Sequence, residues 1–196
     1  MKLISLTQKN IQTTVQTSAE AIRRGNVLIV PTDTVYGIIA NALDEKAVKK
    51  VYLIKERDTA KPLPIFVKHI AMAKKYAAIS ARQEKFLEEN WPGKVTVILA
   101  RKSAAKIFGT ADNTIAMRIP FYHFINSLLD TLGLPLCGTS ANVSGLPAST
   151  KIDDVIAQFQ RSRDLPDIII NAGDLPESKP STIVDLTKKE TAVIRN

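Results

Sequence analysis

Short apolar runs and longer amphipathic stretches alternate along most of the chain. Val27–Val30 is an uninterrupted apolar run, which is typical of a buried strand. From Asp44 onward, apolar residues instead recur every three or four positions with lysines between them, which predicts an amphipathic helix ending around Lys55–Arg57. The pattern of apolar residues therefore predicts that the chain contains both strands and helices.

The same patterns predict the other elements. Thr17-Ser18-Ala19-Glu20 resembles a capping box, so a helix is expected to begin there and to end at Gly25. Further helices are expected at Ile70–Ala78, Ser80–Asn90, Phe121–Leu132 and Ile152–Phe159. Further strands are expected at Leu63–Val67, Val95–Ala100, Thr114–Ile119, Leu134–Cys137, Ile168–Asn171, Thr182–Leu186 and Ala192–Arg195.

The order of these elements predicts an α/β fold. Strands interleave with helices over most of the chain, but the last three strands lack helices between them, so the sheet is expected to be mixed. The sequence contains no internal repeat and no linker rich in Gly, Ser or Pro. Residues 1–196 are therefore expected to form a single domain, an open twisted mixed sheet with flanking helices.

Charge and cysteine content narrow the class of protein. With 27 Lys+Arg against 19 Asp+Glu, the net charge is +8, which favours an anionic partner: nucleic acid, nucleotide or membrane surface. Cys137 is the only cysteine, so neither an intramolecular disulfide nor a Cys-rich zinc site is possible. Without an apolar stretch typical of a signal peptide or a membrane span, the protein is expected to be cytoplasmic.

Several common kinds of site are excluded by motif. None of the 8 glycines forms GxGxxG or a Walker loop, so a nucleotide would have to be held differently. His69 and His123 have no second ligand type at metal spacing, so no protein metal site is expected. GTSAN departs from the GxSxG nucleophile elbow, which makes Ser140 a poor candidate for an acyl-enzyme.

Two polar clusters lie in the first third of the chain. In VLIVPTDTVYGIIA, the residues Thr32, Asp33, Thr34 and Tyr36 interrupt an apolar run with more polar chemistry than a turn requires. In the second cluster, Lys55-Glu56-Arg57 closes the predicted helix, and Lys61 follows. These cations either complement the helix dipole or bind an anion.

Two more clusters follow later. In TIAMRIP, Arg118 is flanked by apolar residues, so it needs an anionic or hydrogen-bonding partner, and no carboxylate is adjacent in sequence. In GTSANVSG, small hydroxyl and amide side chains between Gly138 and Gly145 form either a plain turn or a loop that wraps phosphate or ribose oxygens. Loops at strand ends converge on one crevice, and these would suit a polyanion beside a small polar molecule.

Taken together, PTDTVYG, KER with KPL, WPGKVT, MRIP, TSANVSG and STIVDL resemble, in order and spacing, the motifs of the YrdC-like family of threonylcarbamoyl-AMP synthases. The resemblance implies an open sheet with a positively charged concave face. It also implies an enzyme, a nucleotidyltransferase, that combines L-threonine, bicarbonate and ATP into threonylcarbamoyl-adenylate and pyrophosphate. Mg²⁺ is then expected on ATP oxygens, and downstream threonylcarbamoyl-transferase proteins are expected to use the adenylate to modify tRNA.

The resemblance also implies roles for individual residues. Lys55 and Arg57 match the KxR pair and are expected to be catalytic, by holding the triphosphate and stabilising charge at the reacting phosphate. The residues expected to contact ATP are Arg57, Lys61, Thr114, Ser140, Asn142 and Arg195. The residues expected to contact L-threonine are Thr32, Thr34, Tyr36, Arg118 and Ser181.

Two positions depart from the family pattern, and two other functions stay open. Lys61 stands where many relatives have Asn, and Lys94 where Pro often follows WPG. The chain resembles the short form of the family, without the extra C-terminal domain. The alternatives are a basic RNA-binding module of the same fold without catalysis, and a related carbamoyl or adenylate enzyme. RNA contact through the basic face is compatible with every one of these functions.

Overall fold

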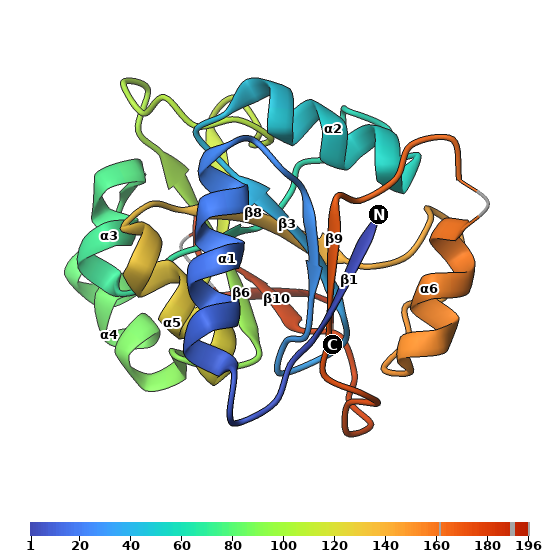
Figure 1. Cartoon of the computed structure of the whole chain (residues 1–196). Helices are drawn as coiled ribbons and strands as arrows, with labels where there is room; N and C mark the ends of the chain where they lie inside the picture. Colours follow the sequence, from blue (N-terminus) through green and yellow to red (C-terminus); the bar gives the residue numbers. More distant parts are fainter. Residues whose placement is uncertain (161, 189–190, 196) are drawn as a thin grey trace.

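The computed structural model describes residues 1–160, 162–188 and 191–195. In this part of the chain, eleven strands form one mixed sheet with six helices on its faces (Figure 1). The strands are β1 (Lys2–Ser5), β2 (Leu28–Val30), β3 (Gly37–Asn41), β4 (Ile65–Phe66), β5 (Ala77–Ala78), β6 (Val95–Arg101), β7 (Thr114–Arg118), β8 (Leu136–Ser140), β9 (Ile168–Asn171), β10 (Thr182–Asp185) and β11 (Ala192–Arg195). The helices are α1 (Ile11–Arg23), α2 (Glu45–Lys55), α3 (Ile70–Tyr76), α4 (Ala81–Asn90), α5 (His123–Leu132) and α6 (Ile152–Gln160).

The strand pairing confirms the predicted mixed α/β sheet. The strand order is β1-β9-β2-β3-β8-β4-β7-β6-β10-β11, with β5 pairing with β6 beside this path. β9 pairs in parallel with β1 and β2, and β10 in parallel with β6, whereas β2, β3 and β8 are antiparallel neighbours. The strands predicted late in the chain therefore return to opposite halves of the sheet.

Two helix starts show how packing and capping decide local structure. α2 begins next to Asp44 as predicted, and the Asp44 carboxylate caps it by accepting hydrogen bonds from the backbone nitrogens of Lys46 and Ala47. The predicted capping box before α1 is wrong: the helix already begins at Ile11, and Ser18 lies in its middle, buried. The long apolar face of α1 packs against α5, so the helix extends well upstream of the polar residues that resemble a cap.

The helices cover the two faces of the sheet unequally. One face packs against α2, α3, α4 and α6, while the other packs against α1 and α5, which lie side by side in Figure 1. On β6 and β7, Val97, Leu99 and Met117 point into the first of these layers. Alternate residues of β6 and β7 therefore point to the other face, where no helix of the described residues packs on these strands. We call this surface of β6 and β7 the open face; it carries Thr96, Ile98, Thr114, Ala116 and Arg118.

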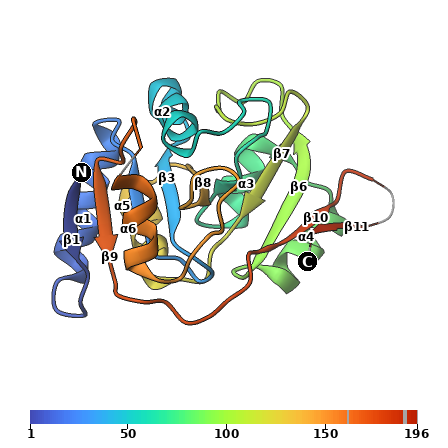
Figure 2. The same ribbon diagram turned by 90° about the vertical axis from the view of Figure 1, so that its right-hand side faces the viewer.

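One long segment connects the two halves of the sheet. Between β9 and β10, residues 172–181 run along the lower side of the molecule in the view of Figure 2. This segment carries β10 to β6, next to the open face. The segment that follows β9 thus lies near β6, although about 80 residues separate the two strands β6 and β10 in sequence.

Candidate functional site

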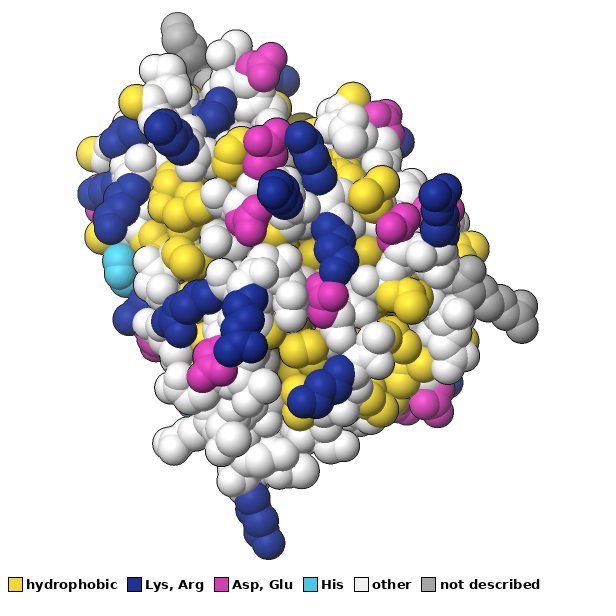
Figure 3. Space-filling model, turned by 45° about the horizontal axis from the view of Figure 1, so that its top comes forward, with side chains coloured by type: hydrophobic (Ala, Val, Ile, Leu, Met, Phe, Trp, Pro, Cys, Tyr) yellow, Lys and Arg dark blue, Asp and Glu magenta, His cyan; other side chains and the backbone are white. Residues whose placement is uncertain are grey.

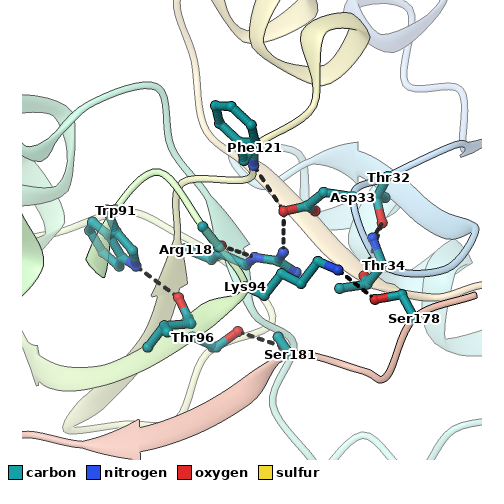
Figure 4. A network of polar contacts seen from close by, with 12 residues as sticks. Thr32, Asp33, Thr34, Trp91, Lys94, Thr96, Arg118, Phe121, Ser178 and Ser181 are labelled. Carbon is teal, nitrogen blue, oxygen red and sulfur yellow. Dashed lines mark hydrogen bonds and ion pairs between the residues drawn. The ribbon is translucent and has the colours of Figure 1, made fainter. Parts of the chain in front are cut away.

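Arg118 lies at the end of β7 in a buried ion pair with Asp33. Its Nη2 donates to Oδ2 of Asp33 at 2.6 Å, and its Nε donates to the Gly93 carbonyl at 2.8 Å (Figure 4). The Arg118 side chain is 4% exposed and that of Asp33 7%. Burial lowers the pKa of Arg118, and the Asp33 carboxylate opposes that shift. The partner that the sequence required for Arg118 is thus a carboxylate from the β2–β3 loop.

Asp33 also ties together other parts of the site. The same Oδ2 accepts a hydrogen bond from the backbone nitrogen of Phe121 at 2.9 Å, just before α5. Its other oxygen, Oδ1, is buried and has no hydrogen-bond partner in the described residues. Asp33 therefore fixes the β2–β3 loop against β7 and the start of α5, and it retains one unused acceptor.

The hydroxyl groups of Thr32 and Thr34 form a chain with a defined direction. The Thr32 hydroxyl donates to the Val35 carbonyl at 2.6 Å and accepts from the Thr34 backbone nitrogen at 3.1 Å. The two hydroxyl oxygens lie 3.0 Å apart. Because Thr32 has one hydroxyl proton and gives it to a carbonyl, Thr34 must be the donor between them. The Thr34 oxygen is left with lone pairs only, so it presents an acceptor. We call Asp33, Arg118, Thr32 and Thr34 the Arg118 cluster.

Tyr36 connects this loop to the chain that follows β9. Its hydroxyl donates to the Gly173 carbonyl at 2.6 Å and accepts from the Ala172 nitrogen at 3.1 Å. Burial raises the pKa of Tyr36 to about 12, so the phenol stays protonated at neutral pH. The hydroxyl thus forms hydrogen bonds to the backbone on both sides and ties the β2–β3 loop to residues 172–173.

Two residues expected to contact different substrates meet near the open face. The Ser181 and Thr96 hydroxyl oxygens lie 3.0 Å apart, and Nη2 of Arg195 on β11 donates to the Ser181 carbonyl at 2.7 Å. The positive charge of Arg195 contributes to the lowered pKa of Arg118, which places these two arginines within electrostatic reach. The C-terminal strand thus brings a second cation to this side of the sheet.

A second cluster surrounds Lys55 at the end of α2. Its Nζ donates to the carbonyl of Ser140 at 2.8 Å and to the carbonyl and side-chain oxygens of Asn142 at 2.9 and 2.8 Å. The Asn142 amide nitrogen donates to the carbonyls of Val143 and Leu146, so this side chain is fully engaged. Lys55 is 3% exposed, and burial, followed by the charge of Arg57, lowers its pKa to about 8. We call Lys55, Ser140 and Asn142 the Lys55 cluster.

The other two predicted cations lie at the surface beside the Lys55 cluster. Arg57 donates through Nε to the Lys61 carbonyl at 3.1 Å and through Nη2 to the Pro62 carbonyl at 3.2 Å, which closes the loop after α2. Glu56 makes this turn possible by adopting a left-handed conformation with φ of 51°. The Lys61 ammonium is exposed and has no side-chain partner among the described residues, so it is available to an anion.

The structure brings most of the predicted residues to neighbouring loops, in two groups. The Arg118 and Lys55 clusters meet through the backbone, where Ala141 donates to the Tyr36 carbonyl at 2.7 Å and Gly37 pairs with Ser140. Thr114 lies apart, at the opposite end of β7 from Arg118 but on the same open face. A hollow of about 530 Å³ adjoins the β2–β3 loop and is lined by Val35, Ala148, Ser149, Thr150, Lys151, Asp154, Glu177, Ser178 and Lys179.

Several residues of the site escaped the sequence interpretation. The sequence identified Asp33 only as a polar residue of its loop. Its role as the partner of Arg118 was missed because the two residues are 85 positions apart. Lys94 donates to the Ser178 hydroxyl at 2.7 Å, which fixes the β9–β10 segment near the open face. A buried arginine inside a strand is a signal that a carboxylate must lie nearby, but this signal does not identify which one.

Surface charge, metal-ligand geometry and helix length add three observations. Over the face that carries α2, Lys and Arg side chains are interspersed with Asp and Glu rather than gathered in one patch (Figure 3). Among the described residues, no group of three His, Cys, Asp or Glu side chains is placed to hold a metal ion. No helix in the described part of the chain combines the length and apolar character needed to cross a membrane.

Fold and site together define an α/β domain in which two buried cations, Arg118 and Lys55, lie among polar loop residues beside an open mixed sheet. More specifically, the chain belongs to the Sua5/YciO/YrdC family, whose model, described as telomere recombination, matches residues 20–196. A Methanocaldococcus jannaschii protein that carries the name threonylcarbamoyl-AMP synthase provisionally is 35% identical over 195 residues, which is 100% of this chain and 91% of that protein.

Two solved structures are similar in fold. The crystal structure of Pyrococcus abyssi Sua5 complexed with L-threonine superposes with a TM-score of 0.90 at 30% identity, covering 100% of this chain and 57% of that one. Escherichia coli YciO matches with a TM-score of 0.85 at 24% identity, covering 100% and 94%, and supports the fold alone. This chain thus spans little more than half of the Pyrococcus protein.

Proposed function

We propose that this chain is an L-threonylcarbamoyladenylate synthase, which makes threonylcarbamoyl-AMP and pyrophosphate from L-threonine, bicarbonate and ATP. The observation that carries the proposal is the presence, on neighbouring loops, of a buried Arg118–Asp33 pair beside the Thr34 acceptor and of a Lys55 cluster without any carboxylate. The first suits an amino acid, and the second suits phosphate groups. The name of the Methanocaldococcus relative and the L-threonine in the Pyrococcus Sua5 structure support the same activity.

The reaction requires charge stabilisation more than covalent catalysis. The amine of threonine and bicarbonate condense to a carbamate with loss of water. A carbamate oxygen then attacks the α-phosphorus of ATP, the new O–P bond forms, and the bond to pyrophosphate breaks. An anion thus approaches an already negative phosphate, so cations and charge-assisted hydrogen bonds of roughly 1.5–3 kcal/mol each lower the barrier.

We assign the phosphate side to Lys55, Arg57 and Lys61. Lys55 holds the TSAN loop through the oxygens of Ser140 and Asn142 and adds positive charge beneath it. Arg57 and Lys61, which lie nearer the surface, contact the triphosphate directly. We propose that Ser140, Thr114 and Arg195 also contact ATP, and that Asn142, whose side chain is engaged within the protein, supports the nucleotide by fixing its loop.

We assign the amino-acid side to the Arg118 cluster. Nε and Nη2 of Arg118 are used by the protein, and Nη1 donates to no group in the described residues, so it is free to bind the threonine carboxylate. Thr34 accepts a hydrogen bond from the amine or the hydroxyl of threonine. Thr32 and Tyr36 support the loop, and Ser181 closes the site from the β9–β10 segment.

The remaining partners follow from the reaction. We propose that Mg²⁺ arrives bound to ATP oxygens, since it keeps much of its water shell and Asp33 is already committed to Arg118. The product would pass to threonylcarbamoyl-transferase proteins that modify tRNA, and any direct RNA contact would be weak and salt-sensitive. The cytoplasmic location expected from the sequence stays a prediction.

Pyrophosphate release by the purified chain tests the proposal directly. ATP would be supplied with L-threonine and bicarbonate together, and then with each omitted in turn. We expect release only when both are present. Absence of release in the complete mixture, together with salt-sensitive RNA binding, would favour the non-catalytic RNA-binding module.

A further inference from the structure

The Arg118–Asp33 pair is electrically balanced before any ligand arrives. Both side chains are more than nine-tenths buried, and their charged atoms lie 2.6 Å apart. Two further cations lie on this side of the sheet, Arg195 and Lys94 (Figure 4), and both side chains are exposed, so water screens their charges. The buried charges of this site, on Arg118 and Asp33, therefore cancel, unlike the charge of a bare arginine pocket.

We propose that Asp33 is a specificity-determining residue that makes this pocket select a zwitterionic amino acid over a carboxylic acid without an amine. The inference rests on the proposed function, because it takes Arg118 as the carboxylate-binding residue. A ligand carboxylate on Arg118 adds one negative charge beside Asp33, and both of these side chains are buried. The ammonium group of an amino acid cancels that charge, whereas a plain hydroxy acid leaves it uncompensated, which is costly in a buried site.

The geometry prevents Asp33 from avoiding this repulsion. A ligand carboxylate would bind the free Nη1, on the same guanidinium whose Nη2 already holds Asp33. Asp33 cannot easily move aside, because its Oδ2 is also held by the backbone nitrogen of Phe121. The two carboxylates must therefore share one cation, and a second positive charge is needed to keep both in place.

Acceptors for that second charge lie next to Asp33. The Thr34 hydroxyl gives its own proton to Thr32 and so presents only lone pairs. Oδ1 of Asp33 has no partner of its own, and its negative charge attracts an ammonium even without direct contact. A ligand with an ammonium beside its carboxylate thus complements Thr34, Asp33 and Arg118 at once.

The test compares two ligands that differ only in the amine. Isothermal titration calorimetry would measure the binding of L-threonine and of (R)-3-hydroxybutyrate to the full chain and to Asp33→Asn. We expect the wild-type protein to bind threonine at least tenfold more tightly. In Asp33→Asn this preference should shrink at least fivefold, because threonine loses affinity while hydroxybutyrate keeps or gains it. An unchanged preference in the folded variant would overturn the inference.

A matched control separates this effect from a general change in charge. Asp130 forms a half-exposed ion pair with Lys68 on the surface, so Asp130→Asn removes the same charge outside the site. This variant should keep the wild-type preference, and a shift equal to that of Asp33→Asn would also overturn the inference. Near-UV circular dichroism would confirm that both variants are folded.

The wild-type protein alone provides a second measurement in case Asp33→Asn does not fold. If it binds threonine and hydroxybutyrate within threefold of each other, the inference is overturned while the proposed function stands. If it binds hydroxybutyrate but not threonine, the proposed function and the inference both fail. A strong preference for threonine supports both.

Discussion

The Lys55 and Arg118 clusters each bury a cation, but they compensate its charge differently. Arg118 is paired with the carboxylate of Asp33, so the net charge of that cluster is zero. Lys55 is surrounded by carbonyl and amide oxygens of Ser140 and Asn142, which satisfy its hydrogen bonds and leave its charge uncancelled. Arg57 adds a further cation next to it.

This difference in charge compensation is the basis on which we propose that the two clusters bind different ligands. A cation that keeps its charge attracts a polyanion, and a balanced pair suits a ligand whose own charges cancel. Burial without a carboxylate partner lowers the pKa of Lys55. Burial also lowers the pKa of Arg118, but the Asp33 carboxylate opposes that shift. The variants below alter one cluster at a time.

The largest effect is expected from Arg118→Met. It leaves the Asp33 carboxylate buried without its partner, which should lower the free energy of unfolding by about 3–5 kcal/mol. Pyrophosphate release should fall at least hundredfold, or about 2.7 kcal/mol in activation free energy, because the threonine carboxylate also loses its cation. Denaturant unfolding and steady-state kinetics would measure the two quantities.

The double variant Asp33→Asn, Arg118→Met separates stability from activity. It removes both charges, so much of the lost stability should return while pyrophosphate release stays low. Recovery of activity along with stability would mean that Arg118 serves only the fold.

Lys55→Ala is expected to lower turnover by about tenfold or more, equivalent to about 1.4 kcal/mol. The loss should appear in steps that involve ATP. Without Lys55, the TSAN loop loses the hydrogen bond from Nζ to the Asn142 carbonyl, and the phosphate side loses a positive charge. Binding of L-threonine, measured by calorimetry, should change less than threefold. Unchanged turnover would remove Lys55 from the mechanism, and an equal loss of threonine binding would contradict the separation of the two clusters.

Part of this site was predictable because its signals are local. Neighbouring residues were enough to predict the start of α2 near Asp44, the strands at Ile168–Asn171 and Ala192–Arg195, and the need of Arg118 for a partner. The identity of that partner depends on how the β2–β3 loop crosses to the end of β7, which no local pattern encodes.

Local patterns also misled where distant packing decides. The start of α1 is set by its contact with α5, so the capping-box pattern failed. β1 was not predicted, because an exposed edge strand of four residues lacks an apolar signature, and its pairing partner β9 lies at the other end of the chain.

Alkaline pH should weaken the Lys55 side of the site. The pKa of Lys55 is lowered to about 8 by burial and by Arg57, so its charge is present below that pH and is lost above it. Turnover at saturating threonine should therefore fall as pH rises through about 8. In Lys55→Met, the residual activity should lack this inflection. A profile with the same inflection in both proteins would assign it to another group.

A smaller effect, confined to the Arg118 side, is expected from Thr34→Val. Loss of the acceptor should raise the KM for threonine about fivefold to tenfold, in line with about 1–1.5 kcal/mol for one hydrogen bond. The KM for ATP should be unchanged. Thr34→Ser keeps the hydroxyl and should behave like the wild type, and equal defects in both variants would point to packing of the methyl group instead.

The smallest effect is expected from Lys61→Ala, on the phosphate side. The ammonium of Lys61 is exposed, so its attraction for the triphosphate is screened by water and salt. The KM for ATP should rise about twofold to threefold at low ionic strength, and the difference from the wild type should vanish toward 0.5 M salt, at roughly half the Debye length of 0.1 M salt. The KM for threonine should not change at either ionic strength. Salt does not screen a structural contact, so a defect in Lys61→Ala that is independent of salt would mean that Lys61 acts through the shape of its loop. In that case Lys61→Arg, which keeps the charge, would show the same rise in the KM for ATP as Lys61→Ala.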